Sequence, residues 1–425
     1  MSRDRQGRPP GRLGVAAWAL YDLANSAFPT VIVTFVFAAY FAKAVAPSET
    51  EGTVLWGNAM AISGVTVALL APIFGAIADR GGPRKPWLLF FTLACLASAC
   101  GLWFVAPEER FVLLALLLAG SANAAFEFGQ AFYNAMLPDL AKPERIGRLS
   151  GWAWGLGYVG GLLCLAITLL VFVQPAVPPF GLDKATAEQI RIVGPFVALW
   201  YLLFAWPLFL FTPDRPRRAK APGSAVREGL AELRTTLADL RQTPWIIRFL
   251  VARLLYIDGL ATLFAFGGLY AAGTFGMTVE EILAFGVLLN VTAGLGAFVF
   301  GWLDDRVGAK PTIEISLVCL ILLGAAILLV EGQLWFWVVG AAIGIFVGPV
   351  QASSRSLMAR LAPPEQATQM FGLFALSGKV TAFLGPALVA FLTGFFDSQR
   401  IGMSAILVLF LLGLLVLRPL RVGRA

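Results

Sequence analysis

Long apolar runs dominate the chain and are separated by short polar segments. An α-helix needs roughly 20 apolar residues to cross a bilayer core about 30 Å thick. The runs are continuous and too long for the roughly ten-residue alternating strands of a membrane barrel. The pattern therefore predicts an all-α integral membrane protein with twelve transmembrane helices, near residues 14–41, 54–78, 86–105, 110–138, 149–173, 193–212, 246–273, 279–303, 311–330, 334–359, 367–395 and 400–418.

The composition agrees with this pattern. Of 425 residues, 59% are hydrophobic and 13% are charged, whereas soluble proteins carry about 25% charged residues. When the N-terminus is placed in the cytoplasm, most of the 32 Lys and Arg residues fall in the tails and inner loops, as the positive-inside rule requires. We expect a lipid-embedded monomer in a bacterial cytoplasmic membrane with both termini cytoplasmic. The net charge of +7 then needs no nucleic-acid partner.

Several kinds of chemistry are disfavoured. The chain has no histidine, which removes imidazole metal sites and the usual nucleophile–base pairs. Its four cysteines lie inside predicted helices, so we expect no disulfide. No Walker-type phosphate loop is present, which excludes ATP as the direct energy source. We expect no enzyme activity, no metal and no cofactor.

The chain divides into two similar halves, 1–212 and 246–425, joined by a basic cytoplasmic linker, 213–245. Apolar residues from Val226 to Leu240 recur every three or four positions, which predicts a linker helix lying on the membrane surface. The loop GAIADRGGPRK from Gly75 is echoed by GWLDDRVGAK from Gly301. A second echo repeats the segment after Gln130 in the segment after Gln351. Such duplication is typical of transporters built from repeats.

The first of these loops resembles the signature of the major facilitator superfamily. The segments WALYDLANSAF, QAFYNAMLPDLA, SGWAWGLGYVGG, QASSRSLMARLAPP and FGLFALSGKVTAFLGP resemble its branch called the unknown major facilitator family, whose eukaryotic relatives are vacuolar amino-acid effluxers of the autophagy pathway. The resemblance implies the major facilitator fold, with two pseudo-symmetric six-helix halves. It also implies a gating role for the loop residues, which are Asp79, Arg80 and Arg84 and, in the second copy, Asp305, Arg306 and Lys310. Asp79 and Asp305 can accept hydrogen bonds from arginines or from a helix N-terminus across the seam between the halves.

Six charged residues remain as candidates inside the predicted helices once those in the loops and in the terminal turns of the helices are set aside. A charge at the bilayer centre costs roughly 2.5–3.5 kcal/mol, so such groups normally face a polar interior and carry function. Three are acidic and three are basic, so they can neutralise one another. Arg355 lies near a cytoplasmic helix end and fits an inner gate, whereas a purely structural alternative pairs Asp22 and Asp258 with Arg253. The six are Asp22, Glu127, Arg253, Asp258, Arg355 and Lys379.

Uncharged polar residues on the same helices extend the candidate site. Pro29 removes a backbone donor one turn after Ser26, which predicts a kink in the first helix. Hydrogen-bonding candidates for a substrate are Asn25, Ser26, Gln130, Asn134, Asn290 and Gln351.

These features predict a secondary active transporter that works by alternating access. Balanced buried charges suit a small polar or zwitterionic solute such as an amino acid: Asp22 or Asp258 would hold its ammonium group, and Arg253 or Lys379 its carboxylate. A proton is the candidate coupling ion, carried by Asp22, Glu127 or Asp258. The alternatives are proton-linked efflux of a drug or other organic metabolite and, from another class, a receptor or scaffold that does not transport.

Overall fold

The computed structural model describes residues 11–216 and 243–420. The predicted surface helix between Val226 and Leu240 lies outside the described residues, so it and the linker boundaries stay predictions. The described part is all-helical, and eleven of its helices are long and apolar enough to cross a membrane.

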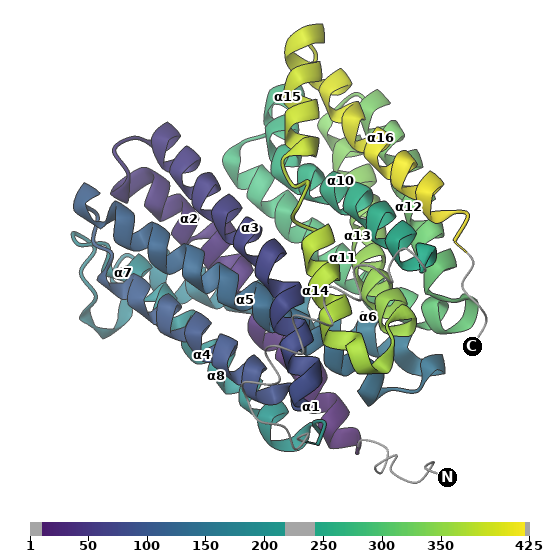
Figure 1. Cartoon of the computed structure of the whole chain (residues 1–425). Helices are drawn as coiled ribbons and strands as arrows, with labels where there is room; N and C mark the ends of the chain where they lie inside the picture. Colours follow the sequence, from purple (N-terminus) through teal and green to yellow (C-terminus); the bar gives the residue numbers. More distant parts are fainter. Residues whose placement is uncertain (1–10, 217–242, 421–425) are drawn as a thin grey trace, which may run out of the picture.

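The helices form two bundles that follow one another along the chain (Figure 1). Within each bundle, neighbouring helices pack pairwise, as α4 packs on α5 and α10 on α16. The first bundle contains α1 (Arg12–Asn25) with its continuation η1 (Phe28–Phe35), α2 (Phe37–Tyr40) and η2 (Phe41–Val45), then α3 (Glu49–Gly81), α4 (Lys85–Gly101), α5 (Val112–Leu140), α6 (Ile146–Ile167), α7 (Glu188–Arg191) and α8 (Val193–Phe211). The second bundle contains α10 (Pro244–Phe275), α11 (Val279–Val307), α12 (Ala309–Leu329), α13 (Gln333–Leu361), α14 (Ala367–Ser377), α15 (Leu384–Phe396) and α16 (Gln399–Leu417).

One prediction about the helices is wrong. The run 367–395 is not a continuous helix, because it is divided into α14 and α15 by a turn at residues 378–383. Hydropathy taken over the whole run did not reveal this break, since Val380, Ala382 and Phe383 keep the run apolar on average despite Gly378 and Lys379.

The first helix is irregular where Pro29 predicts a kink. Regular α-helix ends at Asn25, and the chain continues as the π-helix η1 with Pro29 in its first turn. A wider helical turn accommodates the missing backbone donor of proline. The irregularity lies directly after Asp22 and Asn25, so the backbone changes beside the candidate site.

Both described chain ends lie at one end of the molecule, which we call the terminal end; the opposite end is the far end (Figure 1). At the terminal end, glycines bring the two bundles into backbone contact. A Cβ placed on Gly75 of α3 would lie 2.6 Å from the carbonyl oxygen of Thr368, and one on Gly372 of α14 would lie 2.6 Å from that of Ala71. The ribbons of the two bundles diverge toward the far end (Figure 1). The bundles are therefore closed against each other at the terminal end.

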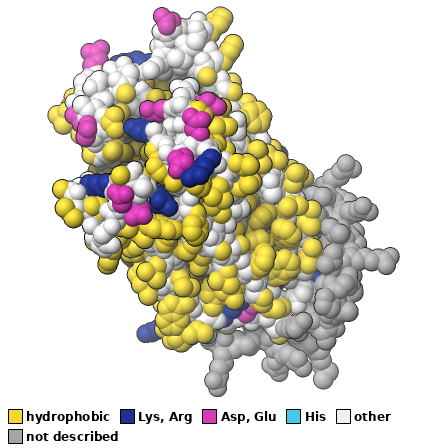
Figure 2. Space-filling view, turned by 90° about the vertical axis from the view of Figure 1, so that its left-hand side faces the viewer, with side chains coloured by type: hydrophobic (Ala, Val, Ile, Leu, Met, Phe, Trp, Pro, Cys, Tyr) yellow, Lys and Arg dark blue, Asp and Glu magenta, His cyan; other side chains and the backbone are white. Residues whose placement is uncertain are grey.

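The surface agrees with a membrane location. Figure 2 shows charged side chains gathered at the far end and hydrophobic side chains covering the middle of the visible face. Large apolar side chains such as Leu69, Leu117 and Leu210 are mostly exposed. A chain that exposes this many apolar side chains along its spans is stable only when lipid covers them.

Candidate functional site

Arg355 of α13 reaches across the seam and is held by the first bundle. Its Nη1 donates to Asp22 Oδ2 at 2.9 Å and to Asn134 Oδ1 at 3.3 Å. Its Nε donates to the hydroxyl of Ser150 at 2.9 Å and its Nη2 to the Ser150 carbonyl at 2.6 Å. Arg355 and Asp22 are 2% and 5% exposed. Removing one partner of so buried a pair typically costs about 3–5 kcal/mol, so this contact stabilises the closed terminal end.

Aromatic rings from the first bundle surround the same guanidinium. Its central carbon lies 5.3 Å from the ring centre of Trp18, 5.8 Å from that of Tyr133 and 5.6 Å from that of Trp154. Each ring face attracts a cation by roughly 0.5–2 kcal/mol, more when water is excluded. Sequence reasoning missed these three residues because aromatic side chains on an apolar helix give no signal beyond ordinary core packing.

The polar residues beside Asp22 form a small network on one side of it. Asn25 Nδ2 donates to Asp22 Oδ1 at 3.5 Å, and Gln130 Nε2 donates to Asn25 Oδ1 at 3.3 Å. The Ser26 hydroxyl donates to the same Asn25 oxygen at 3.4 Å. Four predicted site residues, from α5 and from the C-terminal end of α1 with the residue that follows it, are therefore brought together.

The signature aspartate of the first loop caps a helix of the opposite bundle. Asp79 of α3 accepts hydrogen bonds from the backbone N–H groups of Thr368 at 3.2 Å and Gln369 at 2.9 Å, in the first turn of α14. A carboxylate at this position satisfies free N–H groups and interacts favourably with the helix dipole. The predicted contact across the seam is confirmed.

The second copy of the motif does the same in the reverse direction. Asp305 of α11 accepts from the N–H groups of Gly147 at 2.8 Å and Arg148 at 3.3 Å, in the first turn of α6. The Arg148 side chain also pairs with Asp305 at 2.7 Å. Each bundle thus provides one carboxylate that caps one helix of the other. Two reciprocal contacts of this kind hold the terminal end closed.

Arg84 supports the first of these caps. It lies 3.7 Å from Asp79, donates to the Thr368 hydroxyl at 2.9 Å and pairs with Asp139 at 2.7 Å. Burial lowers the pKa of Arg84, as does neighbouring Arg215, while the carboxylates of Asp139 and Asp79 oppose this shift. Arg80 is half-buried at the end of α3, one residue beyond Asp79.

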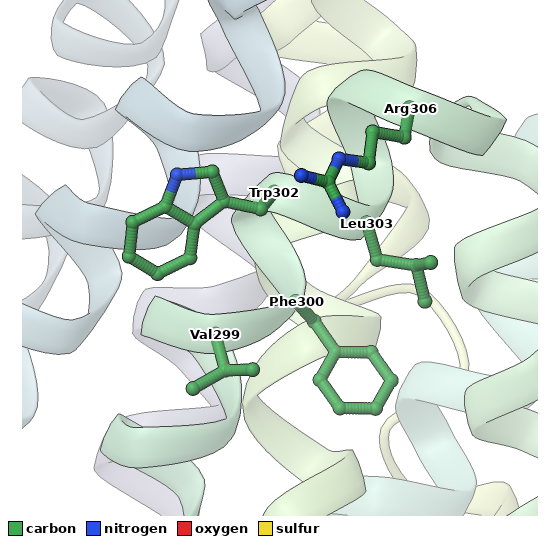
Figure 3. Close-up of a pocket in the computed structure, with 5 residues that line it drawn as sticks. All are labelled: Val299, Phe300, Trp302, Leu303 and Arg306. Carbon is green, nitrogen blue, oxygen red and sulfur yellow. The ribbon is translucent and has the colours of Figure 1, made fainter.

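Two residues expected in the gate make no hydrogen bond or ion pair across the seam among the residues that the structure describes. Arg306 is exposed, and it makes no hydrogen bond or ion pair with another described residue. It lines an open hollow of about 470 Å³ together with Val299, Phe300, Trp302 and Leu303, all from α11 (Figure 3). Lys310 stays within the second bundle, where it pairs with Glu314 at 3.3 Å and donates to the Arg418 carbonyl. The pseudo-symmetry that predicted these roles holds for Asp305 but not for the cations that follow it.

An ion pair joins the bundles at mid-depth. Lys379 Nζ, in the turn between α14 and α15, lies 2.7 Å from Glu127 Oε1 of α5. Glu127 is about 20 Å from either end of its helix and therefore lies near its middle. The two side chains are 31% and 20% exposed. Charged groups at this depth normally avoid lipid and pair with one another, as these two side chains do.

The remaining two charged candidates, Arg253 and Asp258, both lie on α10 and explain the break between α14 and α15. Arg253 donates to the carbonyl of Phe374 at 2.6 Å and to the Ser377 hydroxyl at 2.7 Å, with its guanidinium on the Phe374 ring. That carbonyl would otherwise accept the next backbone hydrogen bond of α14, so the arginine favours the end of the helix there.

Asp258 acts at the start of the next helix. Its Oδ2 accepts from the N–H of Gly385 at 3.0 Å, in the first turn of α15. Its Oδ1 is buried and has no hydrogen-bond partner in the structure. The structural alternative that pairs Asp22 and Asp258 with Arg253 is wrong, because each of the three has different partners. The broken helix, Lys379 and these two α10 residues form what we call the break site.

The remaining candidates are less central. Asn290 donates to the Gly286 carbonyl of its own helix at 2.8 Å, whereas Gln351 donates to the Tyr158 hydroxyl across the seam at 3.2 Å. Asp304 was missed: it is 1% exposed and binds Arg360 and Ser356 within the second bundle. Asp304 directly precedes Asp305 in the repeated loop motif, so the sequence could have indicated it as a candidate. No group of three or more potential metal-ligating side chains occurs within residues 11–216 and 243–420.

Comparison with known proteins decides the family. Residues 49–425 match the family described as vacuole effluxer Atg22 like. The chain belongs to this family. It is 29% identical over 404 residues to the uncharacterized MFS-type transporter YxiO of Bacillus subtilis, with 94% of this chain and 93% of YxiO covered. It is 25% identical over 428 residues to autophagy-related protein 22 of Coccidioides immitis, with 82% and 69% covered.

A solved structure supports the fold independently. The outward conformation of the major facilitator transporter FucP superposes with a TM-score of 0.74 at 13% identity, covering 97% of this chain and 98% of FucP. The all-α fold of the major facilitator superfamily is therefore confirmed. As a member of the Atg22-like family, the chain is a secondary transporter in the membrane and not an enzyme.

Proposed function

We propose that this transporter moves a small polar or zwitterionic organic solute, an amino acid or a related metabolite, by alternating access. The observation that carries the proposal is the Glu127–Lys379 pair, which joins the two bundles at mid-depth and is partly exposed. A carboxylate and an ammonium group 2.7 Å apart can separate and bind the opposite charges of a zwitterion.

The break site supplies further recognition groups. In transporters with broken helices, the half-helix ends commonly face substrate and coupling ions at mid-membrane. Here the N-terminus of α15 is capped by Asp258, whose second oxygen is unused. That oxygen can take up a proton, and we assign proton coupling to Asp258 because Asp22 and Glu127 already have cationic partners.

The sidedness of the closed end follows from charge. The terminal end carries the basic loops, so it is cytoplasmic by the positive-inside rule, in a bacterial cytoplasmic membrane. The structure is then closed toward the cytoplasm, in keeping with its similarity to the outward conformation of FucP. Small-molecule cargo would enter from the far end.

Counterflow in proteoliposomes tests the proposal. Vesicles holding purified protein are loaded with one unlabelled amino acid at a time and diluted into its radiolabelled form, with and without a pH gradient. We expect accumulation of at least one amino acid above empty vesicles and a loss of at least tenfold in K379Q. Failure of every amino acid, combined with export of an organic drug driven by the gradient, would replace the proposal with the efflux alternative.

A further inference from the structure

Arg355 occupies a binding pocket made entirely by the opposite bundle. Its hydrogen-bond acceptors are Asp22 on α1, Asn134 on α5 and Ser150 on α6. The three rings around it come from the same three helices. We call this set the cation box; it consists of Asp22, Asn134, Ser150, Trp18, Tyr133 and Trp154.

The cation box is held together without Arg355. Trp18 Nε1 donates to the Tyr133 carbonyl at 3.1 Å, and the Tyr133 hydroxyl donates to the Trp18 carbonyl at 3.0 Å. Their rings stack with centroids 4.4 Å apart. These reciprocal contacts lie within the first bundle, so they persist when the second bundle moves away. The box is therefore a preorganised receptor for a cation, and Arg355 is its built-in ligand.

Arg355 leaves part of the hydrogen-bonding capacity of this region unused. Trp154 Nε1 is a buried donor without a partner, and Gln130 Oε1 is a buried acceptor without one. Gln130 connects to Asp22 through Asn25. Unused buried polar groups are rare in proteins and call for a ligand or water. Gln130 Oε1 can accept from a cationic group, whereas Trp154 Nε1 needs an acceptor such as a carboxylate oxygen.

Opening of the terminal end must empty the cation box, because Arg355 moves with the second bundle. Asp22 would then be left among aromatic rings without the cation that it pairs with in the closed structure, which is unfavourable. We infer that the cation box binds the cationic group of the transported solute, a primary ammonium or guanidinium group, in the state that is open at the terminal end, where it replaces Arg355. This inference rests on the proposed function and assigns the substrate class more narrowly, to organic solutes that carry a hydrogen-bonding cation.

Such an exchange links cargo to movement. The solute is attracted to the box only when Arg355 is absent, and Arg355 can return only after the solute leaves. Binding energy therefore favours the open terminal end in the presence of cargo and the closed one in its absence. The acceptor oxygens favour cations that donate hydrogen bonds over quaternary ammonium ions.

The first test fills the box with an external cation. Melting temperatures are measured for wild type, R355A and the double variant D22N/R355A in methylguanidinium chloride, with tetramethylammonium chloride at equal ionic strength as the control salt. We expect methylguanidinium to raise the melting temperature of R355A by roughly 2–4 °C more than that of wild type or the double variant. An equal response of all three proteins, or an equal effect of tetramethylammonium, would overturn the inference.

A second measurement does not depend on the folding of R355A. Ala352 is 3% exposed, and its carbonyl accepts the Ser150 hydroxyl across the seam. In a variant without the four native cysteines, A352C is labelled with a membrane-permeant maleimide. Methylguanidinium should speed labelling several-fold by displacing Arg355, and D22N should abolish this effect. No acceleration, or an equal acceleration in D22N, would contradict the inference.

The two proposals fail in different ways. Both tests measure occupancy and opening rather than transport, so a negative result here leaves amino-acid counterflow unaffected. Conversely, a lack of counterflow together with a selective methylguanidinium response would keep the cation box and reject the proposed cargo.

Discussion

A single methyl group at Gly75 is expected to open the terminal end. An ideal Cβ on Gly75 would lie 2.6 Å from the Thr368 carbonyl oxygen and 2.8 Å from the backbone of Gln369, all in the opposite bundle. Backbone atoms of a capped helix cannot move aside as a flexible side chain can. Overpacking of this kind costs about 1–3 kcal/mol, and the cost applies only to the closed state. The ratio of open to closed molecules should therefore rise roughly 5- to 150-fold in G75A.

Gly57 offers a matched control on the same helix. A Cβ on Gly57 has nothing within 4 Å. G75A and G57A both exchange glycine for alanine within α3 and gain the same helix propensity of about 1 kcal/mol. Any difference between them in the open fraction therefore reports the clash at the seam. We expect G57A to behave as wild type. A third variant, G372A, meets the backbone of Ala71 from the other side of the same seam and should reproduce G75A.

Labelling of A352C in the cysteine-free background measures the open fraction. The labelling rate should increase in G75A and G372A and remain at the wild-type value in G57A. It should increase little further in the double variant G75A/G372A, because both substitutions disrupt the same contact between α3 and α14 and their effects are then not additive. If G75A labelled no faster than G57A, the closed seam would not control access, and the account of the terminal end would be wrong.

Three further outcomes are expected. The charge exchange E127K/K379E should keep the free energy of unfolding within about 1 kcal/mol of wild type, because the pair is partly exposed. The variant should nevertheless lose counterflow. A stable variant with full counterflow would refute a role of the pair in substrate binding. D79N should weaken the cap on α14 by about 0.5–2 kcal/mol and so speed A352C labelling roughly 2- to 30-fold; an unchanged rate would contradict this. D258N should lose the stimulation of uptake by a pH gradient while keeping equilibrium exchange; gradient-driven uptake at the wild-type level would remove Asp258 from coupling.

Sequence reasoning found the spans because burial in lipid requires long apolar runs whatever the tertiary packing. It also found the two capping carboxylates. Asp79 and Asp305 occupy matching positions in a repeated motif, each near the end of a helix and next to a short loop. It located charges at membrane depth, but it could not pair them: Asp22 and Arg355 are 333 residues apart, and their contact depends on how the bundles meet.

The helix break was beyond prediction for a related reason. It results from the long-range donation of Arg253 to the Phe374 carbonyl and from the cap by Asp258 on α15. Residues 378–383 include Gly378 and Lys379, but glycine also occurs within continuous transmembrane helices and the other residues are mostly apolar, so the segment does not mark a turn decisively. The aromatic walls of the cation box were missed likewise, since only three-dimensional packing distinguishes them from core residues.

The most direct measurement follows both ends of the molecule at once. Spin labels are placed at exposed positions on opposite bundles, at Lys142 and Arg306 for the terminal end and at Glu109 and Glu331 for the far end. Pulsed electron paramagnetic resonance then gives the distance between the two labels at each end, with and without an amino acid that shows counterflow. The account predicts that cargo lengthens the terminal-end distance while it shortens the far-end distance. Distances that stay unchanged, or that change in the same direction at both ends, would contradict alternating access around charges shared by the two bundles.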